Sequence, residues 1–173
     1  MITLVLGGTR SGKSRHAEDL LPADAPVRYL ATARRDDADA EWAARLEAHR
    51  VRRSAAWTTV EDPDVAALVA AGGTPMLVDD LATWLTGVLD DADAWEAPTV
   101  PAEVGQRVAE LVAAVRSAPG RVVLVSAEVG LGVVPATRAG RLFRDELGAL
   151  NAALAAVADE VVLLVAGLAL RLK

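Results

Sequence analysis

The sequence predicts an α/β fold, a mostly parallel β-sheet with helices on both faces, in a single domain that spans residues 1–173. Short apolar runs rich in valine and leucine alternate along the chain with longer amphipathic stretches. Nearly continuous apolar runs are typical of strands that are buried on both sides. Of the 173 residues, 53% are hydrophobic and 24% are charged, which is the size and composition of one globular domain.

The expected elements follow one another in regular alternation, which implies one sheet flanked by helices. Strands are expected at Ile2–Leu6, Val27–Thr32, Met76–Val78, Val122–Ser126 and Val161–Ala166. Helices are expected at Ser14–Leu21, Asp37–Arg50, Val65–Ala70, Leu81–Leu89, Ala102–Ser117 and Arg138–Ala158. Shorter patterns predict a strand at Trp57–Val60, an edge hairpin at Leu168–Leu172 and an exposed loop at Asp90–Pro101.

Charge and residue usage exclude several classes of protein. A net charge of −6 argues against a nucleic-acid-binding protein, which needs a basic surface. The absence of cysteine excludes disulfides, thiolate catalysis and cysteine-ligated metals. The apolar run Met1–Leu6 has no basic segment and is short, so it is interpreted as a strand and not as a signal peptide. No apolar stretch approaches the ~20 residues of a membrane span, and we expect a cytoplasmic protein.

A glycine-rich motif lies between the first expected strand and the first expected helix. It matches the phosphate-binding P-loop pattern G-x-x-x-x-G-K-[ST] at every defined position. Its residues are Gly7, Gly8, Thr9, Arg10, Ser11, Gly12, Lys13 and Ser14. Glycines let the backbone wrap tightly and direct amide groups at phosphate oxygens. The pattern predicts that Lys13 bridges the β- and γ-phosphates of a nucleotide and that the Ser14 hydroxyl binds Mg²⁺.

Lysine usage supports this interpretation. Among the 18 basic residues, only Lys13 and Lys173 are lysines. A chain that otherwise uses arginine therefore places a lysine where an ammonium group must reach between phosphates. An arginine-rich coding bias would explain the small number of lysines, but it would not explain their position.

An acidic pair follows the strand expected at Met76–Val78. Asp79 comes where the strand leaves the sheet, so it can hold Mg²⁺ through a water or accept hydrogen bonds from the nucleotide. Asp80 would point the other way along a strand, and its simpler role is to cap the helix that begins at Leu81. We therefore assign the metal site to Ser14 and Asp79.

Two histidines are available for acid–base or nucleophilic chemistry. His16 lies one turn into the helix after the motif, and we interpret it as structural. His49 shares a helix face with Trp42 and Leu46, which suits a packed core histidine. The segment Arg50–Arg53 that follows contains three arginines in an acidic protein, which suits an imidazole beside a polyphosphate. The residues alone leave both interpretations of His49 open.

Four segments of the chain combine into a specific pattern. They are Gly7–Glu18 (GGTRSGKSRHAE), Ala31–Ala33 (ATA), Ala44–Leu46 (ARL) leading to His49, and Glu128–Pro135 (EVGLGVVP). Together they resemble the bifunctional adenosylcobinamide kinase / adenosylcobinamide-phosphate guanylyltransferase family. The P-loop by itself is generic, but the combination is specific, and the resemblance runs from Met1 to Lys173.

The resemblance implies two reactions late in cobalamin assembly. ATP or GTP first phosphorylates the aminopropanol hydroxyl of adenosylcobinamide. GTP then guanylylates a histidine, pyrophosphate leaves, and GMP passes to adenosylcobinamide phosphate to give adenosyl-GDP-cobinamide. A neutral imidazole is a competent nucleophile at about pH 7, and a covalent intermediate divides one displacement into two.

The functional residues that the resemblance implies fall on definite positions of this chain. The guanylylated histidine falls on His49, and Lys13 is the second catalytic residue. The implied nucleotide contacts are Gly7–Ser14, Ala31, Thr32, Ala33, Arg50, Val51, Arg52, Arg53, Glu61 and Asp79. The resemblance also implies a RecA-like P-loop fold, Mg²⁺ with GTP and ATP as substrates, and a homo-oligomer that is often a trimer.

Two positions depart from the family's pattern. The loop before Glu128 often reads V-[ST]-N-E, whereas Ala127 stands here in place of the amide, so a hydrogen bond made by that amide is lost. The step from Arg50 to Arg53 lacks the glycine that some relatives carry, which leaves the turn after His49 undefined.

Two other hypotheses compete with the resemblance. The chain could be a simple P-loop small-molecule kinase without guanylyl transfer, or a nucleotide-dependent binding module without transfer chemistry. A signalling GTPase is disfavoured because Asn151, the only asparagine, is not followed by the lysine of an N-K-x-D motif. The segment Glu128–Pro135 is a candidate corrinoid loop, although its glycines suit a plain turn equally well.

Overall fold

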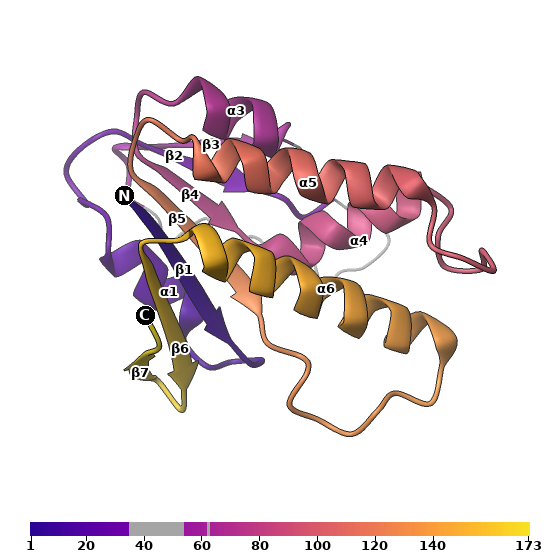
Figure 1. Cartoon of the computed structure of the whole chain (residues 1–173). Coiled ribbons are helices and arrows are strands. Elements are labelled where there is room, and N and C mark those ends of the chain that lie inside the picture. The colour runs from indigo at the N-terminus through magenta and orange to yellow at the C-terminus, as the bar shows by residue number, and fades with distance from the viewer. Residues whose placement is uncertain (35–53, 62) are drawn as a thin grey trace.

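A computed structural model describes residues 1–34, 54–61 and 63–173 of the chain (Figure 1). Its strands are β1 (Ile2–Gly7), β2 (Val27–Ala31), β3 (Trp57–Glu61), β4 (Met76–Asp79), β5 (Val122–Ala127), β6 (Glu160–Val165) and β7 (Leu168–Arg171). Its helices, labelled as in Figure 1, are α1 (Lys13–Asp19), α3 (Val65–Ala71), α4 (Leu81–Asp91), α5 (Ala102–Arg116) and α6 (Arg138–Val157). Each of them begins and ends within about two residues of its expected position. The helix expected at Asp37–Arg50 lies outside the described residues.

The strands form one seven-stranded sheet in the order β3-β2-β4-β5-β1-β6-β7. Every neighbouring pair from β3 to β6 is parallel, which confirms the predicted mostly parallel sheet. These six strands therefore all end at the same edge of the sheet, which we call the carboxyl edge. Functional residues at the ends of different strands meet there.

The expected edge hairpin is confirmed. Strand β7 runs antiparallel to β6, with Val165 opposite Leu168 in the register. The two residues between them, Ala166 and Gly167, have φ angles of 51° and 81°. A two-residue hairpin loop whose twist matches the strands needs positive φ at both positions, and glycine adopts it without strain.

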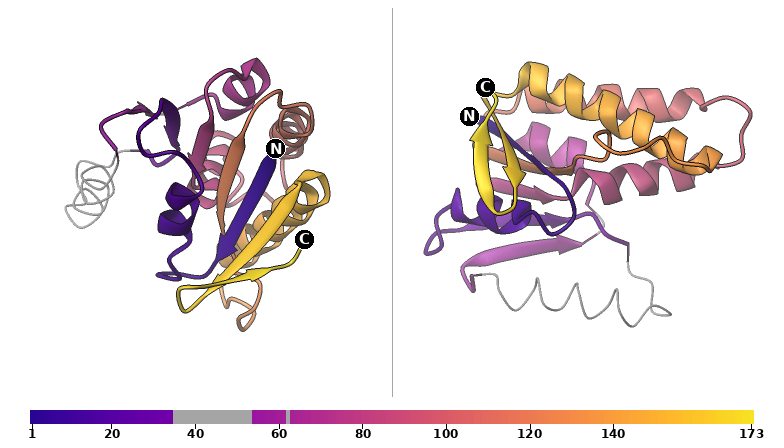
Figure 2. Two further views of the ribbon diagram at one scale, coloured as in Figure 1. Left: turned by 90° about the vertical axis from the view of Figure 1, so that its left-hand side faces the viewer. Right: turned by 90° about the horizontal axis from the view of Figure 1, so that it is seen from below.

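Helices cover both faces of the sheet, but unequally. Helices α3, α4, α5 and α6 lie on one face, and α1 lies on the other (Figures 1 and 2). Successive side chains of a strand point to opposite faces. Leu4 and Leu6 of β1 accordingly belong to the core under the four helices, whereas Val5 belongs to the core with Ala17 of α1. All residues of β1 are buried, as the continuous apolar run predicts.

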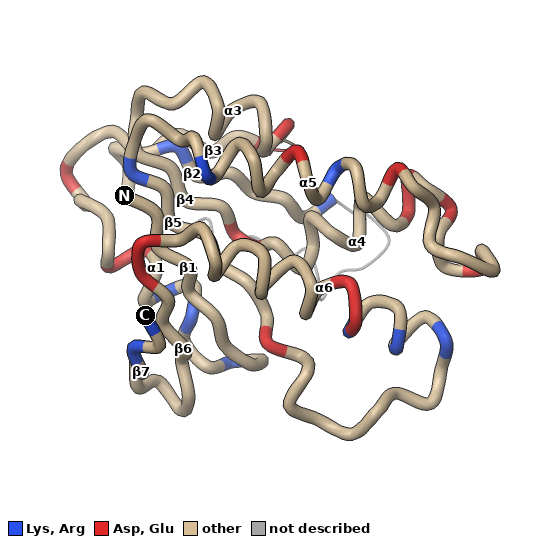
Figure 3. The backbone as a smooth tube through the Cα atoms, in the orientation of Figure 1, with Lys and Arg blue, Asp and Glu red and all other residues tan. Residues whose placement is uncertain are grey.

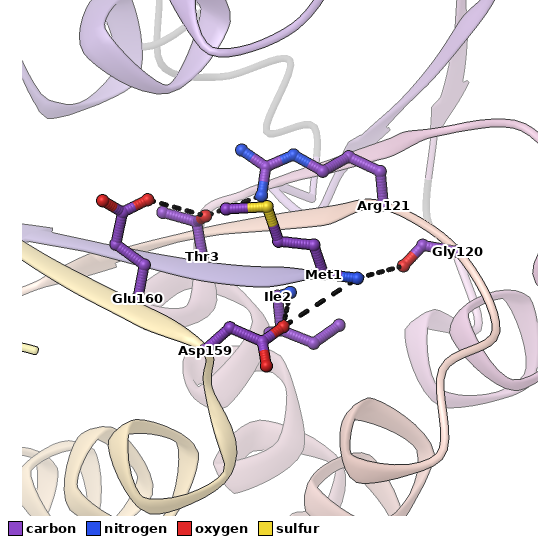
Figure 4. A network of polar contacts seen from close by, with 7 residues as sticks. All are labelled: Met1, Ile2, Thr3, Gly120, Arg121, Asp159 and Glu160. Atoms are coloured by element: carbon purple, nitrogen blue, oxygen red, sulfur yellow. Dashed lines mark hydrogen bonds and ion pairs between the residues drawn. The ribbon is translucent and has the colours of Figure 1, made fainter.

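A polar network joins the first residues of the central strands at the edge opposite the carboxyl edge (Figure 4). Arg121 Nη1 donates a hydrogen bond to the Thr3 hydroxyl over 2.7 Å, and that hydroxyl donates to Glu160 Oε2 over 3.5 Å. The Ile2 amide donates to Asp159 Oδ2 over 2.6 Å. Thr3 is fully buried, so its hydroxyl has exchanged water for these partners and helps to hold β1, β5 and β6 in register.

The network predicts that Thr3→Val destabilises the fold without affecting nucleotide binding. Valine keeps the shape of threonine but leaves Arg121 and Glu160 without their shared partner. The free energy of unfolding should fall by about 1–2 kcal/mol in urea titrations. Thr86→Val is the matched control, because the Thr86 hydroxyl bonds only to Ala82 O within its own helix in the described contacts. Equal unfolding midpoints for the two variants would contradict this role of Thr3.

Candidate active site

The glycine-rich motif forms a loop between β1 and α1 at the carboxyl edge. Gly12, the residue before α1, has a φ of 92° in the left-handed region. A Cβ on Gly7 would lie 2.4 Å from Ser11 Oγ and 3.0 Å from Leu164 O, so only glycine fits there. Three basic residues of this acidic chain, Arg10, Lys13 and Arg15, belong to this loop and the start of α1. Figure 3 colours the basic and acidic positions along the backbone.

Ser11 links the loop to the rest of the sheet. Its carbonyl oxygen accepts a hydrogen bond of 3.1 Å from the Gly167 amide in the β6–β7 turn. Its hydroxyl is buried and has no hydrogen-bond partner within the described parts of the chain. An unpaired buried hydroxyl costs stability, so this arrangement fits a loop in which a bound ligand supplies the missing hydrogen-bond partner.

The predicted metal-site pair is brought together. The Ser14 hydroxyl, in the first turn of α1, donates a hydrogen bond of 3.1 Å to Asp79 Oδ1 at the end of β4. The phenol of Tyr29 donates a hydrogen bond to Asp79 Oδ2. Sequence reasoning missed Tyr29, although a tyrosine inside a buried apolar strand signals a need for a hydrogen-bond partner.

The register of the sheet places further predicted residues beside this pair. Ala31 at the end of β2 lies opposite Asp79 of β4 on one side and opposite Glu61 of β3 on the other. Ala31, Glu61 and Asp79 thus form one row at the carboxyl edge. Ala33 follows this row, whereas His49 and the residues Arg50, Val51, Arg52 and Arg53 lie outside the described residues.

Thr32 has a structural contact that the sequence did not indicate. Its buried hydroxyl donates to Asp80 O over 2.6 Å and lies 2.6 Å from the Thr83 hydroxyl. Two residues later, the Arg34 guanidinium makes a bidentate ion pair with Asp91 at 2.8 and 2.7 Å. These contacts fasten the chain that leaves β2 to helix α4.

Asp80 is the N-cap of α4, as the simpler interpretation of the sequence predicts. Its Oδ1 accepts a hydrogen bond of 2.9 Å from the Thr83 amide. Burial raises the pKa of the Asp80 carboxyl, and the neighbouring Asp79 charge raises it further. The bonds from Thr83 and the charge of Lys13 act in the opposite direction.

The loop between β5 and α6 begins beside the P-loop. The Glu128 amide donates to Gly7 O over 3.1 Å, and Glu128 Oε1 accepts from the Gly130 amide over 2.7 Å. Beyond this turn, Leu131 and Val133 are 83% and 95% exposed. The loop therefore begins beside the site, and farther along it presents apolar side chains to solvent.

Asn151 of α6 has a structural role behind this loop. Its Oδ1 accepts a hydrogen bond of 2.6 Å from the Ser126 hydroxyl, and its Nδ2 donates to Ala127 O over 3.0 Å. The backbone oxygen of Ala127 thus has a hydrogen-bond partner from α6. The other histidine of the sequence, His16, lies half-buried in α1 beside the buried Ala17.

The loop, the strand ends and their contacts define the class of the protein. A P-loop follows a buried parallel strand, and its last serine bonds to an aspartate at the end of a second strand. This arrangement is that of a P-loop nucleotide-binding protein. Within the described residues no helix is long and apolar enough to cross a membrane.

Comparisons with known proteins identify the family. The family model described as "Cobinamide kinase / cobinamide phosphate guanyltransferase" matches residues 3–172. The "Bifunctional adenosylcobalamin biosynthesis protein CobU" of Escherichia coli K12 is 40% identical over the full length of both chains. A protein CobP of Pseudomonas aeruginosa with the same description is 42% identical over all of this chain and 98% of its own length. The chain belongs to this family and is a cobinamide kinase and cobinamide phosphate guanylyltransferase, as the sequence predicts.

A solved structure shares the fold at low sequence identity. An ATPase from the type III secretion system of pathogenic bacteria superposes with a TM-score of 0.50 and 13% identity. The match covers 95% of this chain and 51% of that one. It confirms the predicted RecA-like P-loop fold and carries no further argument about function.

The cap and the charge at Asp80 can be separated by two substitutions. Asp80→Ala should lower the free energy of unfolding by about 1 kcal/mol, because it removes the cap. Asp80→Asn keeps an oxygen for the Thr83 amide and removes the charge beside Asp79, so it should match or exceed wild-type stability at neutral pH. A raised pKa means that the ionised carboxyl is disfavoured in the folded state. The contribution of Asp80 to wild-type stability therefore falls as the pH rises above its ordinary pKa of 3.8.

The advantage of Asp80→Asn should accordingly disappear in acid, where both proteins carry an uncharged side chain. Thermal unfolding of the three proteins at acidic and neutral pH measures this. If Asp80→Asn is as unstable as Asp80→Ala at neutral pH, the charge of Asp80 does not destabilise the folded protein, and the prediction is wrong.

Proposed function

We propose that the chain acts in cobalamin biosynthesis on the adenosylated substrates. It phosphorylates adenosylcobinamide with ATP or GTP, and then transfers GMP from GTP through a guanylyl-histidine on His49 to give adenosyl-GDP-cobinamide. The observation that carries the nucleotide-binding part of this proposal is the Ser14–Asp79 hydrogen bond, which joins the P-loop to the end of β4. Full-length relatives described as adenosylcobalamin biosynthesis proteins support it.

The donor set beside the P-loop fits Mg²⁺. One hydroxyl oxygen and one carboxylate oxygen lie 3.1 Å apart at Ser14 and Asp79. Mg²⁺ in nucleotide sites binds through one or two protein oxygens together with phosphates and waters. Among the described residues, no group of three or more histidine, cysteine, aspartate or glutamate side chains could hold a metal ion. Bound there, Mg²⁺ would neutralise phosphate charge.

In the kinase reaction the P-loop residues Gly7–Ser14 bind the triphosphate. The substrate hydroxyl oxygen attacks the γ-phosphorus, the bond to the β-phosphate oxygen breaks, and the hydroxyl proton passes to water. Lys13 balances the charge that develops on the departing diphosphate. Gly7, where no larger residue fits, lets the loop wrap tightly, and backbone amides of such a loop would hold the phosphates in place for this displacement.

In the guanylyl transfer the neutral imidazole of His49 attacks the α-phosphorus of GTP, and pyrophosphate leaves. A phosphate oxygen of the cobinamide phosphate then displaces the histidine, which regenerates the imidazole. Ala31–Ala33, Arg50–Arg53 and Glu61 are proposed nucleotide contacts. The row that Ala31, Glu61 and Asp79 form at the carboxyl edge, with Asp79 bonded to Ser14 of the P-loop, supports this placement. Arginines near His49 would neutralise the departing pyrophosphate.

The proposal includes a homo-oligomer, a trimer by the resemblance, and a cytoplasmic location. Edge strands of a sheet present unpaired backbone groups and are usually covered. Strand β7 is such an edge, and its Leu168 and Leu170 are 75% and 56% exposed. A second copy that covers this strand would bury these side chains.

The guanylyl-histidine can be tested by mass spectrometry of the intact protein after incubation with Mg-GTP alone. One GMP should be added and pyrophosphate released, and the bond should be labile in acid and stable in base, as expected of a phosphoramidate. His49→Ala should give no adduct and no guanylyl transfer, while keeping kinase activity at least in part. Acid should suppress adduct formation, because a protonated imidazole has no free lone pair.

His16→Ala is the matched control, and it should keep both the adduct and the transfer. An adduct on another residue, or none with GTP, would contradict the guanylyltransferase mechanism. The simple P-loop kinase would then replace it as the better account of the site.

A further inference from the structure

A buried tyrosine contacts the carboxylate of the proposed metal site from inside the core. Tyr29 lies in the middle of β2 and is only 1% exposed. Its phenol donates a hydrogen bond to Asp79 Oδ2, while the Ser14 hydroxyl donates to Oδ1 of the same carboxylate. Each oxygen of Asp79 therefore has its own donor, and the side chain is held from two sides.

The tyrosine itself is fixed by its surroundings. Strand β2 is paired on both sides, and Tyr29 lies opposite Leu77 of β4 and opposite Thr59 of β3. The ring belongs to the core that α1 covers, and its centroid lies 6.5 Å from that of Trp57 at an interplanar angle of 33°. A ring packed in this way cannot follow a moving partner, so the hydrogen bond sets the position of the carboxylate.

We propose that Tyr29 is a positioning residue for the Mg-nucleotide site, acting through Asp79. In this role its phenol contacts the Asp79 carboxylate and need not contact the metal or the nucleotide. The inference rests on the proposed role of Asp79 in holding Mg²⁺. Without the phenol hydroxyl, the Asp79 carboxylate loses a donor at Oδ2 and is held less firmly in one side-chain rotamer. Binding of the Mg-nucleotide must then order this side chain, which weakens binding.

Tyr29→Phe tests this directly because it removes one oxygen and keeps the ring. The Mg²⁺ concentration needed for half-maximal GTP binding should rise roughly tenfold, as expected for a lost hydrogen bond to a charged group. GTP binding without Mg²⁺ should stay the same. Ser117→Ala is the matched control, since it also removes one hydroxyl, at the end of α5, where that hydroxyl bonds to Ala113 O. It should leave the Mg²⁺ requirement unchanged.

The same titrations in an Asp79→Asn background show whether Tyr29 acts through Asp79. If it does, Tyr29→Phe should add little to the effect of Asp79→Asn, because the carboxylate that it positions is already gone. If Tyr29→Phe has an equally large effect in wild-type and Asp79→Asn protein, the proposal is overturned. Such a result would indicate that Tyr29 acts through core packing and not through Asp79. If Tyr29→Phe behaves like Ser117→Ala while Asp79→Asn raises the Mg²⁺ requirement, the proposal fails and the proposed function stands. If no variant changes the Mg²⁺ concentration needed for half-maximal GTP binding, the proposed metal role of Asp79 fails as well.

A second readout needs neither metal nor activity. Tyr29 is the only tyrosine of the chain, so tyrosine labelled with ¹³C at Cζ gives a single NMR signal. The Cζ shift responds to the hydrogen bond of the phenol, and it should move in Asp79→Asn protein without nucleotide. It should stay in place in Ser117→Ala protein. A signal that is unchanged by Asp79→Asn would overturn the contact on which the proposal depends.

Discussion

The hydrogen bond between Ser14 and Asp79 is the interaction on which the site depends. It joins two residues that are 65 positions apart in the chain, one in the first turn of α1 and one at the end of β4. Neither residue can reach the other unless β1, β5 and β4 lie side by side and parallel. This contact therefore forms only when both the strand order and the conformation of the P-loop are correct, and the chemistry of the site depends on it.

The rest of the structure keeps the two partners in place. The starts of β1, β5 and β6 are held by the buried network around Thr3, and their ends lie at the carboxyl edge. On that edge the P-loop is fastened at Gly7 by the Glu128 amide and at Ser11 by the Gly167 amide. Because the central strands β1 and β5 are buried on both faces, these positions cannot shift independently of the core.

The sequence was sufficient to predict those features that depend on local pattern. The apolar run Ile2–Leu6 is a strand with both faces buried, and Asp80 caps α4 because a carboxylate directly before a helix accepts from its first amides. Asp79 could be assigned to the metal site from the sequence because it follows a buried apolar strand. At Asp90–Pro101 the local pattern was partly wrong, since α4 continues to Asp91 and Ala94 is fully buried.

What the sequence could not predict depends on contacts between distant strands. Tyr29 sits within an apolar run, and only the register of β2 against β4 brings its phenol to Asp79. Thr32 was assigned to the nucleotide, whereas its hydroxyl bonds to Asp80 O and contacts Thr83 in the described structure. Whether it also contacts a nucleotide stays a prediction, as does the role of His49.

The most direct test of the central claim is the affinity for Mg-GTP in Ser14→Ala, Asp79→Asn and the double variant, measured by calorimetry. If the two residues form one unit, each single substitution should weaken binding by about tenfold or more. The double variant should then bind little worse than the weaker single variant. Effects that multiply in the double variant, or a wild-type affinity in either single variant, would contradict the account.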